Sequence, residues 1–185
     1  MKKGTIKLLL ISVFVLILLI IFVKSYSSLS SLNEEVINKE SNINVQLNKK
    51  REQVESICEA LKKYIVDEEL FNNIEEANIK LKNSMNKDIK ERNTANEELS
   101  KLINQLFERK NEEMLKDEEV ISTIEELLKT EKRLDTARNN YNEAVENYNS
   151  KVKSFPASII ASFRGFKTKD VFNAIEINNI LEKEE

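Results

Sequence analysis

Residues 117–155 read DEEVISTIEELLKTEKRLDTARNNYNEAVENYNSKVKSF, and this stretch decides the fold. Its apolar residues recur in steps of three, four or seven, which places them along one face of a long helix. Asp117 is a good N-cap at the positive end of the helix dipole, and Pro156 ends the helix. A face this long must be covered by other helices. It consists of Val120, Ile124, Leu127, Leu134, Tyr141, Val145, Tyr148, Val152 and Phe155.

The rest of the chain supplies those helices. With two glycines and one proline in 185 residues, the chain is poor in turn formers and typical of an all-α protein. Apolar residues at helical spacing run from Tyr26 to Tyr64, after a serine-rich start (residues 27–31) that we expect to be a loose linker. Asp67 begins a second helix, residues 86–93 form a turn, and Thr94 caps a third. The pattern predicts a long antiparallel up-down four-helix bundle with coiled-coil-like packing over residues 26–155.

The N-terminal segment, residues 1–25, combines lysines with an apolar run. The uncharged run is Leu8 to Val23, and counting from Ile6 gives 18 residues, about 27 Å of helix against roughly 30 Å of hydrocarbon. A cleaved signal peptide is the alternative, but only Ser25-Tyr26-Ser27 resembles a cleavage site. We therefore expect an uncleaved transmembrane helix.

Charge predicts the orientation and excludes one class of partner. Lys2, Lys3 and Lys7 precede the apolar run, which places the N-terminus in the cytoplasm and the bundle on the outer side of the cell membrane. Residues 25–185 carry 25 basic and 32 acidic groups, a net charge of −7. Such a domain is a poor candidate for binding nucleic acid.

Few reactions are open to this chain, because it has no histidine and one cysteine. Histidine-based acid–base catalysis, Cys–His pairs and the usual zinc sites are excluded. Cys58 lies in an apolar pattern and is expected to be a core residue. We expect no enzyme activity, no cofactor and no metal.

Two polar residues interrupt the apolar face of residues 117–155, Glu131 and Arg138. If the first and last helices are antiparallel with Tyr26 level with Phe155, facing residue numbers sum to about 181, which pairs Glu131 with Lys50 or one of its neighbours. Such an ion pair would fix the helix register. The alternative is a polar binding pocket in the middle of the bundle.

The C-terminal segment, residues 156–185, changes composition. Apolar residues alternate with cations, which suits a segment in the lipid headgroup region; the alternative is that these side chains cap the open end of the bundle. Residues 176–185 are expected to be a frayed acidic tail. The candidate interface residues are Ile159, Ile160, Phe163, Arg164, Phe166 and Lys167.

Three blocks of sequence resemble the LemA family of bacterial membrane proteins: YSSL at residues 26–29, INVQLNKK at 43–50 and RNNYNEAVENYN at 138–149, which continues through FPASIIA at 155–161. The resemblance implies a membrane-anchored helical bundle without established enzyme activity. Family members often occur beside membrane metalloproteases or TPM-domain proteins, which suggests a membrane-protein partner. Glu55 and Arg51 depart from the family pattern, where proline and an aromatic residue are common.

The function expected from these patterns is a non-enzymatic scaffold or adaptor. The alternative is a membrane-tethered sensor that binds a small ligand or a peptide and is linked to a membrane protease. A water-accessible polar cavity near Gln46, Lys50, Glu131 and Arg138 would favour the sensor, and a dry core would oppose it. The helix seams would also support a homo-oligomer.

Overall fold

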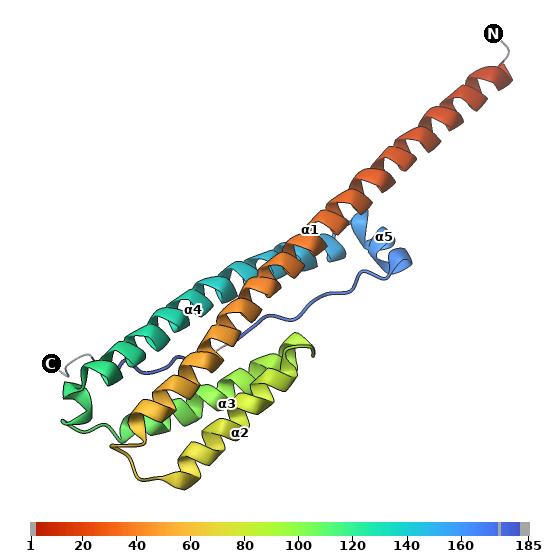
Figure 1. Ribbon diagram of the computed structural model, residues 1–185. Coiled ribbons are helices and arrows are strands. Elements are labelled where there is room, and N and C mark those ends of the chain that lie inside the picture. Colours follow the sequence, from red (N-terminus) through yellow and green to blue (C-terminus); the bar gives the residue numbers. More distant parts are fainter. Residues whose placement is uncertain (1–2, 174, 182–185) are drawn as a thin grey trace. The chain divides into compact units, whose positions relative to one another are not determined.

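The computed structural model describes residues 3–173 and 175–181, and within them the chain is all-helical (Figure 1). The elements are α1 (Lys3–Leu61), α2 (Glu68–Ser84), α3 (Ile89–Glu108), the short 3₁₀ helix η1 (Met114–Lys116), α4 (Glu118–Lys153) and α5 (Ala157–Arg164). The all-α class predicted from the sequence is confirmed.

Helix α1 is continuous for 59 residues, so the loose serine linker predicted at residues 27–31 is wrong. No glycine or proline occurs between Thr5 and Leu61, and a serine costs a helix only about 0.5 kcal/mol relative to alanine. Buried Leu29 and Val36 continue the packed face through the serines. The N-terminal part of α1 is long and apolar enough to cross a membrane, and none of its most apolar 18-residue window is buried.

Helices α2 and α3 lie side by side (Figure 1). Asp67 caps α2 as predicted, because its carboxylate accepts the Leu70 N–H at 3.0 Å. The cap predicted for α3 at Thr94 is wrong. Helix α3 begins at Ile89, and Asp88 is the cap, accepting the Glu91 N–H at 2.8 Å. Asp88 followed three residues later by Glu91 is a capping-box-like signal that the apolar pattern concealed.

Helix α4 begins where the sequence predicts, since Asp117 Oδ1 accepts the N–H groups of Glu119 (2.9 Å) and Val120 (3.4 Å). Its predicted apolar face is largely buried, and Tyr141 and Tyr148 are each 1% exposed. Phe155 is the exception. It follows the end of α4 and is 83% exposed.

The contacts divide the chain into two compact units. Unit 1 comprises Met1–Asn38 and Glu143–Lys169, and unit 2 comprises Lys39–Asn142 and Asp170–Glu185. In unit 1, α5 packs its buried residues Ala157, Ile160 and Ala161 against Leu29 of α1. Gly165 ends α5 at φ 77°, a left-handed conformation that favours glycine. The predicted domains 1–25, 26–155 and 156–185, which follow membrane, bundle and tail, stay predictions.

Candidate functional site

Among the described residues of unit 2, Lys50 is the most deeply buried charged residue. Its side chain on α1 is fully buried, and Nζ lies 2.9 Å from Glu131 Oε1 of α4. The same ammonium donates to Asn96 Oδ1 at 2.9 Å and to Ser100 Oγ at 2.7 Å, both on α3. The Lys50 ammonium therefore makes two hydrogen bonds to α3 and one ion pair to α4. The structure thus brings together the two residues that the predicted helix register pairs.

Burial of the Lys50 network carries a desolvation cost and requires each partner to be in place. Removal from water lowers the pKa of Lys50, and Glu131 partly opposes that shift. The Nδ2 of Asn96, a fully buried residue, has no hydrogen-bond partner among the described residues. Asn96 and Ser100 did not stand out in the sequence, although polar residues four apart within an apolar helix pattern were the available signal.

A second buried cation, Arg92, lies on the face of α3 that also carries Asn96 and Ser100. Arg92 is 3% exposed, and its Nη1 donates to Glu40 Oε1 (3.0 Å) and Asn44 Oδ1 (2.8 Å) of α1. Its Nη2 donates to the Lys87 carbonyl at 2.8 Å. Helix α3 therefore faces α1 with a polar stripe of Arg92, Asn96 and Ser100, spaced by one helical turn.

Arg138 does not join the Lys50 network. It pairs with Asp135 on its own helix, and the buried position beside it belongs to Ala137. Both Glu131 and Arg138 line a cavity of about 330 Å³, whereas Gln46 and Lys50 do not. The far wall of this cavity is formed by the C-terminal segment at Ile175, Glu176, Ile177 and Asn179.

Residues 176–181 of the predicted frayed tail are packed, so that prediction is wrong for the described residues. Asn104 of α3 donates Nδ2 to the Glu176 carbonyl (3.0 Å), and its Oδ1 accepts the Asn178 N–H (2.8 Å). Ile177 and Ile180 are 8% and 7% exposed. The apolar residues among the acidic ones explain why the segment binds the helices. Residues 182–185 lie outside the described residues.

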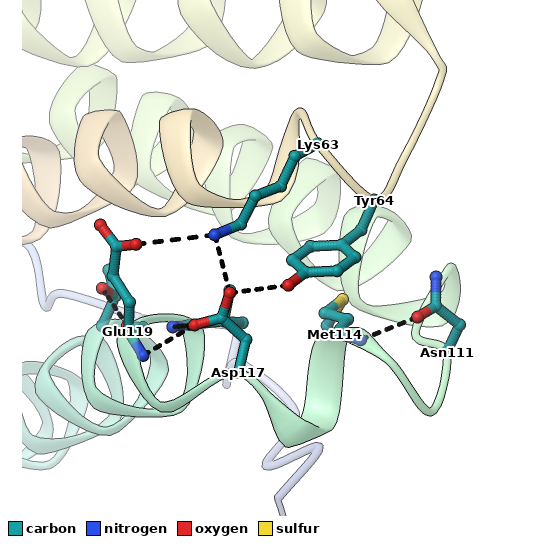
Figure 2. A network of polar contacts seen from close by, with 8 residues as sticks. Lys63, Tyr64, Asn111, Met114, Asp117 and Glu119 are labelled. Atoms are coloured by element: carbon teal, nitrogen blue, oxygen red, sulfur yellow. Dashed lines mark hydrogen bonds and ion pairs between the residues drawn. The ribbon is translucent and has the colours of Figure 1, made fainter.

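A solvent-facing polar cluster joins the end of α1 to the start of α4 (Figure 2). Asp117 Oδ2 accepts the Tyr64 hydroxyl at 2.6 Å and lies 2.7 Å from Lys63 Nζ. Lys63 also lies 3.6 Å from Glu119. The ammonium of Lys63, and then the hydroxyl of Tyr64, hold the pKa of Asp117 far below its usual value.

An acidic groove lies between the C-terminal part of α1 and α2, with a volume of about 710 Å³. Apolar side chains, including Phe71 and Ile74, line it together with five carboxylates and one cation, Lys62. Cys58 also lines the groove. Burial raises the pKa of its thiol to about 12, which keeps the thiol protonated at neutral pH. The five carboxylates belong to Glu55, Glu59, Asp67, Glu68 and Glu75.

The candidate interface residues divide between the two faces of α5. Ile160 is 2% exposed and Phe166 packs against the unit 1 core, so these two cap the core rather than face outward. Ile159 and Phe163 are 61% and 83% exposed. Arg164 stacks 5.0 Å over the Tyr26 ring and, like Lys167, is exposed. Residues four apart on a helix share a face, so Ala157 and Ala161 are buried together, whereas Ile159 and Phe163 are exposed together.

Comparison with known proteins gives one family. Among residues 3–173 and 175–181, no group of three or more His, Cys, Asp or Glu could hold a metal ion. The chain matches none of the curated proteins with which it was compared. The model of the LemA family matches residues 39–182, which covers well over half of the chain. This match places the chain in the LemA family.

Proposed function

We propose that this chain is a non-enzymatic, membrane-anchored adaptor whose helices form an antiparallel up-down four-helix bundle. The antiparallel arrangement is supported by two contacts, one between α1 and α4 and one between the residues that follow α1 and precede α4. Lys50 pairs with Glu131 and Tyr64 with Asp117, and in both pairs the residue numbers sum to 181. A constant sum is the property of two helices that run in opposite directions in one register.

The acidic groove between α1 and α2 carries the adaptor proposal. Its apolar floor and acidic rim are complementary to a basic amphipathic segment of a partner protein. Val66 at its edge is 98% exposed, and Ile79 is 48% exposed. Because the anchor holds the chain at a membrane, the partner is expected to be a membrane protein.

Photocrosslinking tests the groove in intact cells. A photoreactive amino acid at Ile79 should yield one dominant adduct with a membrane protein, whereas the same probe at Val45 should not. Val45 is a matched control because it is 47% exposed and does not line the groove. Equal adducts from both positions would contradict a docking site in the groove.

Charge reversal tests the chemistry of the partner. Glu75→Lys should reduce the Ile79 adduct about tenfold, because a cation in the rim repels a basic segment. Glu76→Lys is the control, since Glu76 is the exposed neighbour that does not line the groove. An adduct that Glu75→Lys leaves unchanged would overturn the proposed basic partner.

The membrane anchor is the second part of the proposal, and the apolar part of α1 supports it. In unit 1, α5 packs beside Tyr26, three residues after the end of the apolar run at Val23. Exposed Phe155, Ile159 and Phe163 would then lie in the headgroup layer with Arg164 and Lys167. The fluorescence of Phe163→Trp should be quenched by brominated lipids, and that of Val66→Trp should not; equal quenching would contradict the placement.

The lysines before the apolar run support a bundle outside the cytoplasm. A cysteine placed at exposed Lys90 of a Cys58→Ser chain should react with a membrane-impermeant maleimide on intact cells. Protection until the cells are lysed would place the bundle in the cytoplasm.

A sensor is the second candidate function, because Glu131 and Arg138 line a cavity whose walls carry both polar and apolar side chains. Its volume, about 330 Å³, suits a small ligand or part of a peptide. Gln46 and Lys50 do not line it, so the cavity lies beside the buried network rather than within it.

A further inference from the structure

The C-terminal segment of unit 2 is held mainly through its backbone. Residues 170–173 and 175–181, here called the strap, contain no helix or strand. Asn142 of α4 donates Nδ2 to the Phe172 carbonyl at 2.9 Å, and its Oδ1 accepts the Phe172 N–H at 2.8 Å. The Tyr141 hydroxyl donates to the Asp170 carbonyl at 2.9 Å, and Asn104 holds the strap again at Glu176 and Asn178.

This mode of binding does not depend on the sequence of the strap. An asparagine amide has one acceptor oxygen and a donor NH₂, so it pairs with a peptide group as a neighbouring strand would. Asn142 and Asn104 each bond both an N–H and a carbonyl of the strap. Any extended peptide could make the same bonds. Side-chain selectivity then comes from the few buried anchors, which are Phe172, Ile177 and Ile180.

The strap does not fill the groove in which it lies. The cavity of about 330 Å³ between strap and α4 is lined on one side by Ile175 and Ile177. That volume is comparable to about ten water molecules, so a side chain larger than isoleucine fits. Lys132, Asp135 and Arg138 on the α4 side offer polar partners to its far end.

We propose that the strap groove binds an extended segment of a partner protein, with the strap as the intramolecular competitor. The recognised segment has an aromatic residue at the Phe172 position and a side chain larger than isoleucine at the Ile175 position. The inference rests on the second candidate function, peptide sensing, and uses a surface different from the acidic groove. Because the strap competes at an effective concentration in the millimolar range, a partner segment binds only if it outcompetes the strap.

Fluorescence anisotropy of a labelled peptide tests the site on the full-length chain in detergent. The probe is a synthetic peptide with the sequence of residues 168–181. It should bind the Phe172→Ala chain about tenfold more tightly than the wild type, because the weakened strap vacates the groove. A peptide carrying Ile175→Phe should bind about fivefold more tightly still, since it fills the cavity.

Two matched variants locate the binding to the groove. Asn142→Ala in the Phe172→Ala chain should weaken peptide binding about tenfold, whereas Asn140→Ala should not, because Asn140 is exposed on the same helix. If Phe172→Ala does not fold by circular dichroism, Asn104→Ala opens the strap without emptying the core, with exposed Gln105→Ala as its control. Peptide binding unaffected by Asn142→Ala, or absent from both opened chains, would overturn the proposal.

Two further measurements distinguish this proposal from self-association and from docking in the acidic groove. A doubled mass of the opened chain in size-exclusion chromatography would show that the strap of a second copy fills the groove, and would overturn the partner segment. Glu75→Lys should leave peptide binding unchanged, since Glu75 lines the acidic groove and not the strap groove. Loss of the crosslinked adduct would therefore reject the adaptor without rejecting this site.

Discussion

Two polar contacts of unit 2 differ in their access to water: one joins α1 to α4, and the other joins the residues that follow α1 to the N-cap of α4. The Lys50 ammonium is fully buried among Asn96, Ser100 and Glu131. Asp117, near the end of α1, holds Lys63, whose side chain is 48% exposed, together with Tyr64. The residue numbers of both contacts fit the same helix register. The Lys50 contact carries a desolvation cost that the Asp117 contact largely avoids.

Because the two contacts differ in burial, they contribute differently to the choice of helix register and to the stability of the fold. A buried charge is tolerated only when its partners are in place, so the Lys50 network penalises every misaligned pairing of the helices. The Asp117 cluster can exchange its partners for water and penalises misalignment little. We infer that Lys50 and Glu131 fix the register, whereas Asp117 mainly caps α4 and orders the end of α1.

Of the substitutions at these polar contacts, Lys50→Met should lower the free energy of unfolding most. It leaves Glu131, whose side chain is 14% exposed, without its cation, and the free energy of unfolding should fall by about 3–5 kcal/mol. Guanidinium titration of the full-length chain in detergent, followed by circular dichroism, measures the change. Lys49→Met is the control, because Lys49 is exposed on the same helix.

Adding Glu131→Leu to Lys50→Met should recover at least about 1 kcal/mol of that loss, since no charge then remains buried alone. Recovery stays incomplete because Asn96 Oδ1 and Ser100 Oγ still lose their donor. A double variant no more stable than Lys50→Met would contradict the desolvation argument.

The sequence predicts the helices and the Lys50–Glu131 register, but not the side chains around them. Apolar spacing and the Asp67 and Asp117 caps are local signals, and the register follows from helix geometry. Arg92 falls in the predicted turn at residues 86–93, and Asn96 and Ser100 are polar residues of the predicted third helix. Only the packing of α3 against α1 explains why all three are buried. The strap is held by Asn104 and Asn142, far away in sequence, so composition alone suggested a frayed tail.

Arg92→Leu should lower the free energy of unfolding less than Lys50→Met, because Glu40, the partner of Arg92, is less buried than Glu131, the partner of Lys50. Glu40 is 29% exposed and can turn toward water once the guanidinium is gone. The loss is then mainly that of the charged hydrogen bonds to Glu40 and Asn44, about 1.5–3 kcal/mol. Arg133→Leu on the exposed face of α4 serves as the control and should stay within about 0.5 kcal/mol of wild type. If Arg92→Leu lowered the free energy of unfolding as much as Lys50→Met, the cost of losing a cation would not depend on how deeply its partner is buried.

Asp117→Asn should have the smallest effect, and one that depends on pH. Asparagine can still cap α4, so the substitution removes only the charge facing Lys63 and Tyr64. The pKa of Asp117 is lowered in the folded chain, so its contribution is present above the unfolded value of about 4 and is lost as pH falls toward the folded value.

The guanidinium midpoint of wild type should therefore exceed that of Asp117→Asn at pH 7, and the two should converge below about pH 4. Glu118→Gln removes a charge from the same helix end, where Glu118 has an exposed side chain. It should lower the midpoint less at pH 7. A difference between wild type and Asp117→Asn that persists unchanged to pH 2 would mean that the carboxylate acts through its shape as a cap, and the contrast with Lys50 would then be one of packing rather than of access to water.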